Sequence, residues 1–205
     1  MKISCLLLSL VLPLLAHSQA LPPAATHAAN VAEFQRQLNR EFSDPAESPL
    51  SATERVAFRE LPFYPVAYGY CVAARLVRDS TAVTFAMPVS LGQPHQYRKY
   101  GTLHFALDGQ PRQLAVYQSL ALLQKPGYAD YLFVPFTDLT NGHGSYHGGR
   151  YLDLRIPAPG VAEVVLDFNR AYNPSCAYSA RYACPIPPAE NRLPIAIEVG
   201  VRSDH

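Results

Sequence analysis

The chain has 205 residues, of which 17 are basic and 16 acidic, so its formal net charge is only +1. This balance argues against nucleic acid or an anionic membrane surface as the main partner, because both select proteins with a basic excess. Charged residues are scarce at 16%, whereas 19 prolines interrupt the chain and favour strands and loops over long helices.

The first 20 residues, MKISCLLLSLVLPLLAHSQA, have the pattern of a secretory signal peptide. Lys2 supplies a positive start, residues 3–15 an apolar core, and Ser18-Gln19-Ala20 a small-residue cleavage site after Ala20. A membrane anchor is the alternative, but spanning a bilayer requires about 20 apolar residues and Pro13 interrupts this run. We therefore predict a signal peptide at 1–20 and an exported protein, periplasmic or extracellular, with no integral membrane segment after cleavage.

A linker at residues 21–29 and two short helices are expected next. Asn30 and Glu33 match a capping box, and apolar residues recur at helical spacing over 31–42. This pattern predicts a helix that begins at Asn30 and ends before Pro45.

A second capping box, Ser51 with Glu54, opens a short helix that Pro62 ends. From Pro65 onward the apolar residues alternate with a period of two, which indicates half-buried strands. The predicted strands span residues 66–76, 81–87, 100–107, 114–117, 131–136, 151–156, 161–168 and 193–199.

Turn signals support this order of strands. Asp108-Gly109 predicts a hairpin, and residues 92–99 are interpreted as a loop. Pro135 weakens the central strand prediction for 131–136, because proline cannot donate to a strand ladder. About eight short strands predict a mainly β protein, either an antiparallel sandwich or a partly open barrel, with a single domain over 30–205.

The cysteines allow several interpretations. Cys176 and Cys184 are separated by seven residues, and in an exported protein they are expected to form a disulfide. A metal site would need two more ligands, and a reactive thiol would need a nearby base, yet no histidine lies in this segment. Cys71 is interpreted as a small buried hydrophobe. His143 and His147 lie in a glycine-rich loop and are expected to be solvated, so no metal and no cofactor are predicted.

Two polar loops, 137–150 and 167–191, hold the candidate site residues. Acid–base candidates are Asp138, Arg150, Asp167 and Glu190, and either Arg150 or Arg170 could pair with Asp167. Asp153 and Arg170 belong to the same ionisable set. The candidates for ligand binding are Tyr146, Arg150, Tyr151, Asn169, Tyr172, Asn173 and Asn191.

Several long segments carry a resemblance to a known family. They are YGTLHFALDG at 100–109, YLFVPFTDLTNG at 131–142, GGRYLDL at 148–154, DFNRAYNPSCAY at 167–178 and CPIPPAENRLPIAI at 184–197. With these segments the chain resembles domain-of-unknown-function family 1684, DUF1684, from about residue 33 to 200. The resemblance implies no established activity. It also implies that a disulfide is not the only explanation of the cysteine pair, because family members that look cytoplasmic carry it as well.

The chain departs from the family pattern at two acids. The family loop G-x-E-T-Y-G-G-G-R-Y has Gly144 here in place of the acid, and the usual A-G-E-K ending has Val201 in place of its acid. If either acid is catalytic in the family, this chain is impaired. The candidates that match the family are Asp138, Asp167, Asn169, Asn173, Glu190 and Asn191.

The sequence favours an exported domain that binds an unknown small molecule through the two loops. A small hydrolase with Asp or Glu acid–base residues is the first alternative, and a structural domain with a buried polar network is the second. Mutual pairing of Asp138, Arg150, Asp167 and Glu190 away from solvent would favour the structural hypothesis. Two carboxylates in an open pocket, with His147 or Cys176, would favour the enzyme.

Overall fold

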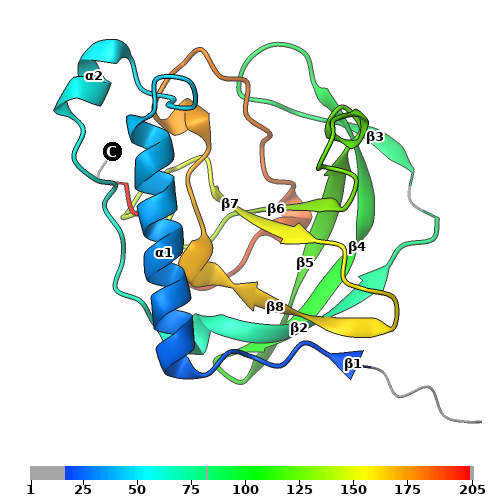
Figure 1. The fold of residues 1–205 in the computed structure, drawn as a ribbon. Coiled ribbons are helices and arrows are strands. Elements are labelled where there is room, and N and C mark those ends of the chain that lie inside the picture. Colours follow the sequence, from blue (N-terminus) through cyan, green and yellow to red (C-terminus); the bar gives the residue numbers. More distant parts are fainter. Residues whose placement is uncertain (1–16, 82, 204–205) are drawn as a thin grey trace, which may run out of the picture.

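Eight strands of one sheet dominate the computed structural model, which describes residues 17–81 and 83–203 (Figure 1). The sheet order is β1-β8-β2-β4-β5-β6-β7, and β3 pairs with the first four residues of β4, His95 to Arg98. Every pairing is antiparallel except that of β1 with β8. The strands are β1 (His17–Ser18), β2 (Cys71–Arg78), β3 (Thr84–Met87), β4 (His95–Leu107), β5 (Gln110–Ser119), β6 (Tyr131–Phe136), β7 (Arg150–Arg155) and β8 (Val161–Asp167).

The predicted mainly β class is confirmed, and the architecture is the partly open barrel. The sheet curls so that Tyr151 of β7 forms an isolated bridge with Tyr172, which lies five residues beyond the end of β8. Elsewhere β7 pairs only with β6, and the later half of β8 pairs only with β2 within the described residues. An open seam therefore separates β7 from β8, and α1 runs past this side of the sheet (Figure 1).

The β4–β5 hairpin follows the prediction, because Asp108 and Gly109 form its turn with φ of 52° and 70°. Both positive values suit the two-residue hairpin turn that Asp-Gly favours. The predicted loop at 92–99 is wrong over its second half, since β4 begins at His95. Tyr97 and Tyr100 are buried there, so the alternation extends into the part that was interpreted as a loop.

The predicted last strand at 193–199 is also wrong. Leu193, Ile197 and Val199 are buried in the main core, but they form no named strand. The carbonyl oxygens of Ile197 and Val199 accept hydrogen bonds from the Arg150 side chain instead of from a neighbouring strand. Pro194 in addition removes one backbone donor.

Two helices lie between β1 and β2 in the chain, α1 (Ala24–Ser43) and α2 (Ala52–Ala57). The predicted start of the first helix at Asn30 is wrong, because residues 24–29, expected to be linker, form its first turns. Alanine is the best helix former, and the four alanines in this stretch extend the helix towards Pro23. The Ser51–Glu54 capping box of α2 is confirmed by both of its hydrogen bonds.

The buried face of α1 positions the site. His27, Val31, Leu38 and Phe42 are its buried residues, and their spacing places them on one stripe of the helix. Leu38 and Phe42 pack with Leu61, whereas His27 lies at the N-terminal end of the same stripe. Between residues 17 and 203, neither helix has the length and apolarity needed to cross a membrane.

Candidate functional site

The loop at 137–150 is closed around a buried ion pair. Arg150 and Asp138 have side chains with 0% exposure, and their Nη2 and Oδ2 atoms are 2.8 Å apart. Arg150 also donates to the carbonyl oxygens of Ile197 and Val199, and Asp138 Oδ1 accepts from Thr140. Asp138 and Arg150, predicted to act in catalysis or binding, therefore hold two chain segments together. Among the described residues, Asp167 pairs with His27 and with neither Arg150 nor Arg170, the two partners that the sequence suggested for it.

Asn191, predicted to bind ligand, is also fully buried and structural. Its side chain accepts from Ala115 N and donates to the carbonyl oxygens of Ala115 and Pro135. The β5–β6 pairing consists of the single pair Tyr117 with Phe133. The Asn191 amide bridges the two strands where Pro135 cannot donate, which explains how proline is tolerated in this buried strand.

Glu190 lies at the surface, apart from the other carboxylates. It pairs with Lys99 and accepts a hydrogen bond of 2.6 Å from Tyr117. Although partial burial alone would raise its pKa, the hydrogen bonds from Lys99 and Tyr117 lower the pKa of Glu190. A charged acid of this kind is suited to an ion pair and not to proton donation near pH 7.

The cysteine pair is adjacent, but both thiols are free in this structure. The backbone N–H of Cys176 donates to Cys184 Sγ at 3.1 Å, and the Tyr146 hydroxyl lies 3.8 Å from Cys176 Sγ. Burial and the neighbouring Cys176 raise the pKa of Cys184 to about 12. Asn173, another predicted binding residue, is buried and donates to the Tyr178 hydroxyl.

A cavity of about 530 Å³ lies in the open seam between β7 and β8. The start of α1 borders it on one side, and Tyr128 and Tyr131 border it on another. It collects the titratable side chains His27, Cys71, Asp153, Arg155, Asp167 and Arg170. This seam cavity, and not the 137–150 loop, is the place where several ionisable groups meet an open space.

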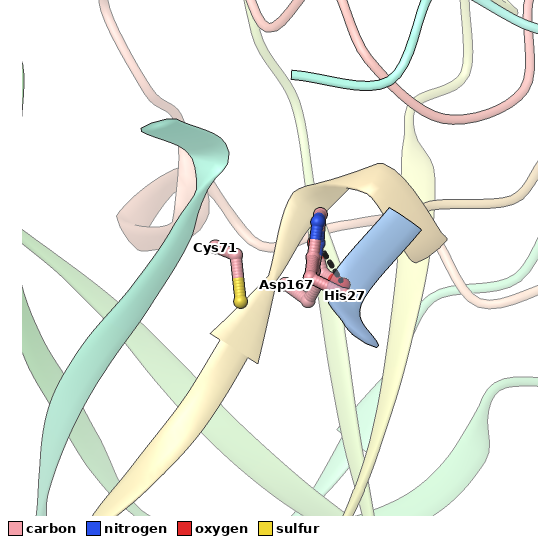
Figure 2. A group of neighbouring side chains, drawn as sticks. All are labelled: His27, Cys71 and Asp167. Atoms are coloured by element: carbon pink, nitrogen blue, oxygen red, sulfur yellow. Dashed lines mark hydrogen bonds and ion pairs between the residues drawn. The ribbon is translucent and has the colours of Figure 1, made fainter. Parts of the chain in front are cut away.

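Asp167 and Cys71 meet in the cavity wall because of strand register. They are directly opposite each other in the antiparallel β2–β8 pair, so their side chains stand on the same face of the sheet. The first turns of α1 bring His27 to them, and its Nε2 lies 3.0 Å from Asp167 Oδ2 (Figure 2). Figure 2 shows the Cys71 thiol on the neighbouring strand, beside this pair.

Asp167 is held on both of its oxygens. Oδ1 accepts hydrogen bonds from the backbone and side-chain nitrogens of Asn169, at 3.1 and 2.8 Å. Asn169 is itself fixed by two hydrogen bonds to the Ala67 backbone. Asn169, predicted to bind ligand, thus positions the carboxylate. Burial and the Asp167 charge raise the pKa of Cys71 to about 11.

A second carboxylate, Asp153, lines the same cavity. Its Oδ1 accepts hydrogen bonds from the hydroxyls of Tyr131 and Tyr172, at 2.7 and 2.8 Å. Its Oδ2 has no hydrogen-bond partner among residues 17–81 and 83–203. Desolvation of the carboxylate by the surrounding protein raises the pKa of Asp153. The hydrogen bonds from the two tyrosines and the positive charge of Arg170 act in the opposite direction.

Two arginines line the cavity, Arg155 and Arg170, and they differ in whether they are paired. The Arg170 guanidinium stacks on the Phe34 ring at 5.0 Å, and it forms no ion pair within the described part of the chain. Arg155, by contrast, is paired with Asp130. The cavity therefore presents one uncommitted guanidinium together with the free oxygen of Asp153.

Asp167, Asn169 and Tyr172 were predicted from the sequence, whereas His27 was not, and Cys71 was predicted only as a core residue. Cys71 is indeed buried, at 3% exposure. The available signal for His27 was the helical stripe, because His27 precedes Val31 by four residues. The expected companions His147 and Cys176 do not line the seam cavity.

A family model described as "Protein of unknown function (DUF1684)" matches residues 56–202. The solution NMR structure of an uncharacterized protein of Haloarcula marismortui superposes on the chain with a TM-score of 0.68 and 33% sequence identity. The match covers 88% of this chain and 96% of the other. A search of curated proteins found no match.

Proposed function

The chain belongs to DUF1684, a family of proteins of unknown function, and we propose that it is a domain that binds a small polar molecule in the seam cavity. The observation that carries this proposal is the convergence of Asp153, Asp167 and Arg170 on one open cavity. Binding pockets commonly have volumes of about 300–1,000 Å³ and a few convergent polar groups. The volume of about 530 Å³ falls within that range.

The polar groups of the cavity favour a ligand that carries both hydroxyl or amino groups and an anionic group. Asp153 Oδ2 offers a free acceptor, and Arg170 offers a planar donor suited to carboxylate or phosphate. The later half of β8 and the part of β7 beyond Tyr151 can add backbone hydrogen bonds, because these stretches of strand edge face the seam without pairing. Hydroxy acids, amino acids and sugar acids have this combination of groups.

This proposal relocates the predicted binding site. The 167–191 segment still contributes Asp167 and Arg170, whereas the 137–150 loop contributes no residue to the cavity. A separate surface cavity of about 400 Å³ lies beside that loop, near His143 and His147. Asp138 is the only carboxylate among the described residues that line it, and Asp138 is already bound to Arg150, so this second cavity is the weaker candidate.

The hydrolase alternative has one specific observation in its favour. Asp167 and His27 form a hydrogen-bonded pair beside Cys71, as an orienting acid, a base and a nucleophile do in thiol hydrolases. The surroundings of Cys71 oppose it, because a pKa near 11 leaves little thiolate at neutral pH. We therefore favour binding over thiol-dependent hydrolysis.

Asp153→Asn should weaken ligand binding at least tenfold while leaving the fold intact. Asparagine keeps an oxygen that can accept from Tyr131 and Tyr172, but it loses the negative charge that faces the ligand. Thermal shift against a panel of hydroxycarboxylates, amino acids and sugar acids would identify a ligand, and calorimetry would measure its affinity. Glu60→Gln, at an exposed acid outside the cavity, is the matched control. Equal affinity in Asp153→Asn and Glu60→Gln would contradict the proposal.

We also propose export, with cleavage after Ala20 and oxidation of Cys176 with Cys184. The adjacency of the two thiols supports the disulfide. Cleavage would remove Gln19, which borders the seam cavity, together with β1. The mature protein would then have a wider seam than the full chain.

Intact mass spectrometry of protein recovered from its native host tests both parts of this proposal. The expected mass begins at Leu21, and without reductant only one of the three remaining cysteines is alkylated after denaturation. Reduction should raise the number of alkylated cysteines to three. An intact N-terminus would contradict export by this route, and three alkylated cysteines without reductant would contradict the disulfide.

A further inference from the structure

We propose that His27, Cys71 and Asp167 bind one zinc ion in the wall of the seam cavity. One donor atom from each of these three residues lies within 4.8 Å of the other two. Imidazole, thiolate and carboxylate are the three donor types that zinc uses in proteins. This site could not be predicted from local sequence patterns, because its residues come from α1, β2 and β8 and are far apart in the chain.

The distances fit a zinc ion after a small closure. Neighbouring donors on a tetrahedral zinc ion, with bonds of about 2.0–2.3 Å, lie about 3.3–3.6 Å apart. His27 Nε2 and Asp167 Oδ2 are already 3.0 Å apart, so an ion could replace the proton between them with little movement. Because the three donor atoms lie within 4.8 Å of one another, the Cys71 thiol would have to approach by at most roughly 1 Å.

Packing alone does not account for His27. Its exposure is 2%, yet Nδ1 has no hydrogen-bond partner among the described residues. Buried polar side chains in proteins are usually satisfied on each polar atom, so a histidine with one unpaired ring nitrogen is unusual as a purely structural residue. The other ring nitrogen, Nε2, points at the carboxylate of Asp167 beside the Cys71 thiol, so three side chains of the kinds that bind zinc lie together.

The surroundings of Asp167 match those of a metal ligand. Carboxylates that bind metal ions are themselves fixed by hydrogen bonds from neighbouring groups. Asn169 holds Asp167 Oδ1 through two hydrogen bonds, which leaves Oδ2 directed at His27. A carboxylate and a thiolate together would balance the charge of a divalent ion.

Three protein ligands also leave room for a fourth. Structural zinc sites use four protein ligands, whereas catalytic sites use three and keep a position for water or substrate. All three residues line the seam cavity, so the remaining coordination position is accessible from it. The zinc ion would therefore lie next to the small molecule of the proposed function, although zinc binding does not depend on that molecule.

Metal titration of the purified, reduced protein tests the inference. We expect one zinc ion per chain, and cobalt(II) in its place should give a thiolate-to-cobalt absorption band. Cys71→Ala should abolish that band and weaken zinc binding by more than about 100-fold, since loss of a mere supporting residue already costs about 10- to 100-fold. His27→Gln should weaken zinc binding to a similar extent.

Two controls make the result decisive. The double variant Cys176→Ser, Cys184→Ser should keep the band, because those thiols lie outside the proposed site. Asp153→Asn should keep zinc but lose the small molecule, so failure of the two proposals can be told apart. Circular dichroism would confirm that each variant is folded. Absence of zinc binding at micromolar ion, or equal affinity in folded Cys71→Ala, would overturn the inference.

Discussion

Arg150→Ala is expected to lower the free energy of unfolding by about 3–5 kcal/mol, the usual cost of removing one partner of a buried ion pair. Arg150 has no exposed surface, and its loss would leave Asp138 charged and buried without its cation. The carbonyl oxygens of Ile197 and Val199 would lose their donors as well. For a chain of this length the corresponding fall in Tm is about 6–20 °C.

Chemical denaturation followed by circular dichroism measures this effect. Arg155→Ala is the matched control, because the Arg155–Asp130 pair is more than half exposed and its removal should change stability by less than about 0.5 kcal/mol. The double variant Arg150→Leu, Asp138→Leu should be more stable than Arg150→Ala, since it leaves no unpaired buried charge. Equal stabilities of Arg150→Ala and Arg155→Ala would disprove the structural role of the pair.

Asn191→Ala should destabilise the fold by at least about 3 kcal/mol, because it leaves three backbone groups unsatisfied at about 1–3 kcal/mol each. These groups are the N–H and C=O of Ala115 and the C=O of Pro135. Hydrogen exchange gives a local readout, since the Ala115 amide should exchange faster in the variant. Gln93→Ala, at an exposed loop position, should leave both stability and this amide unchanged. Unaltered exchange at Ala115 in Asn191→Ala would be incompatible with this account.

The strands were predictable where local pattern and turn chemistry agree. Alternation and Asp108-Gly109 specify the β4–β5 hairpin, because both its strands and its turn are local features. The 193–199 segment has the same apolar alternation but is not a strand, because Arg150, more than 40 residues earlier, binds its carbonyl groups. Such a tertiary interaction has no signature in the local sequence.

The site was predictable only in part for the same reason. Asp167 stood out as an acid at a strand end, and the structure places it in the seam cavity. Its contact with Cys71 depends on strand register, and its contact with His27 joins residues 140 positions apart. Arg150 looked like a binding residue because charged groups are rarely buried. Its partner Asp138 and its burial become evident only from the folded chain.

Whether the seam cavity is the functional site is tested most directly by chemical-shift mapping on the protein. The ligand for this experiment is the compound that gives the largest thermal shift. Titration into the isotope-labelled protein should perturb the amides of Cys71, Asp153, Asp167 and Arg170, which line the cavity. Perturbations confined to residues 137–149, with the seam residues unchanged, would contradict the central claim.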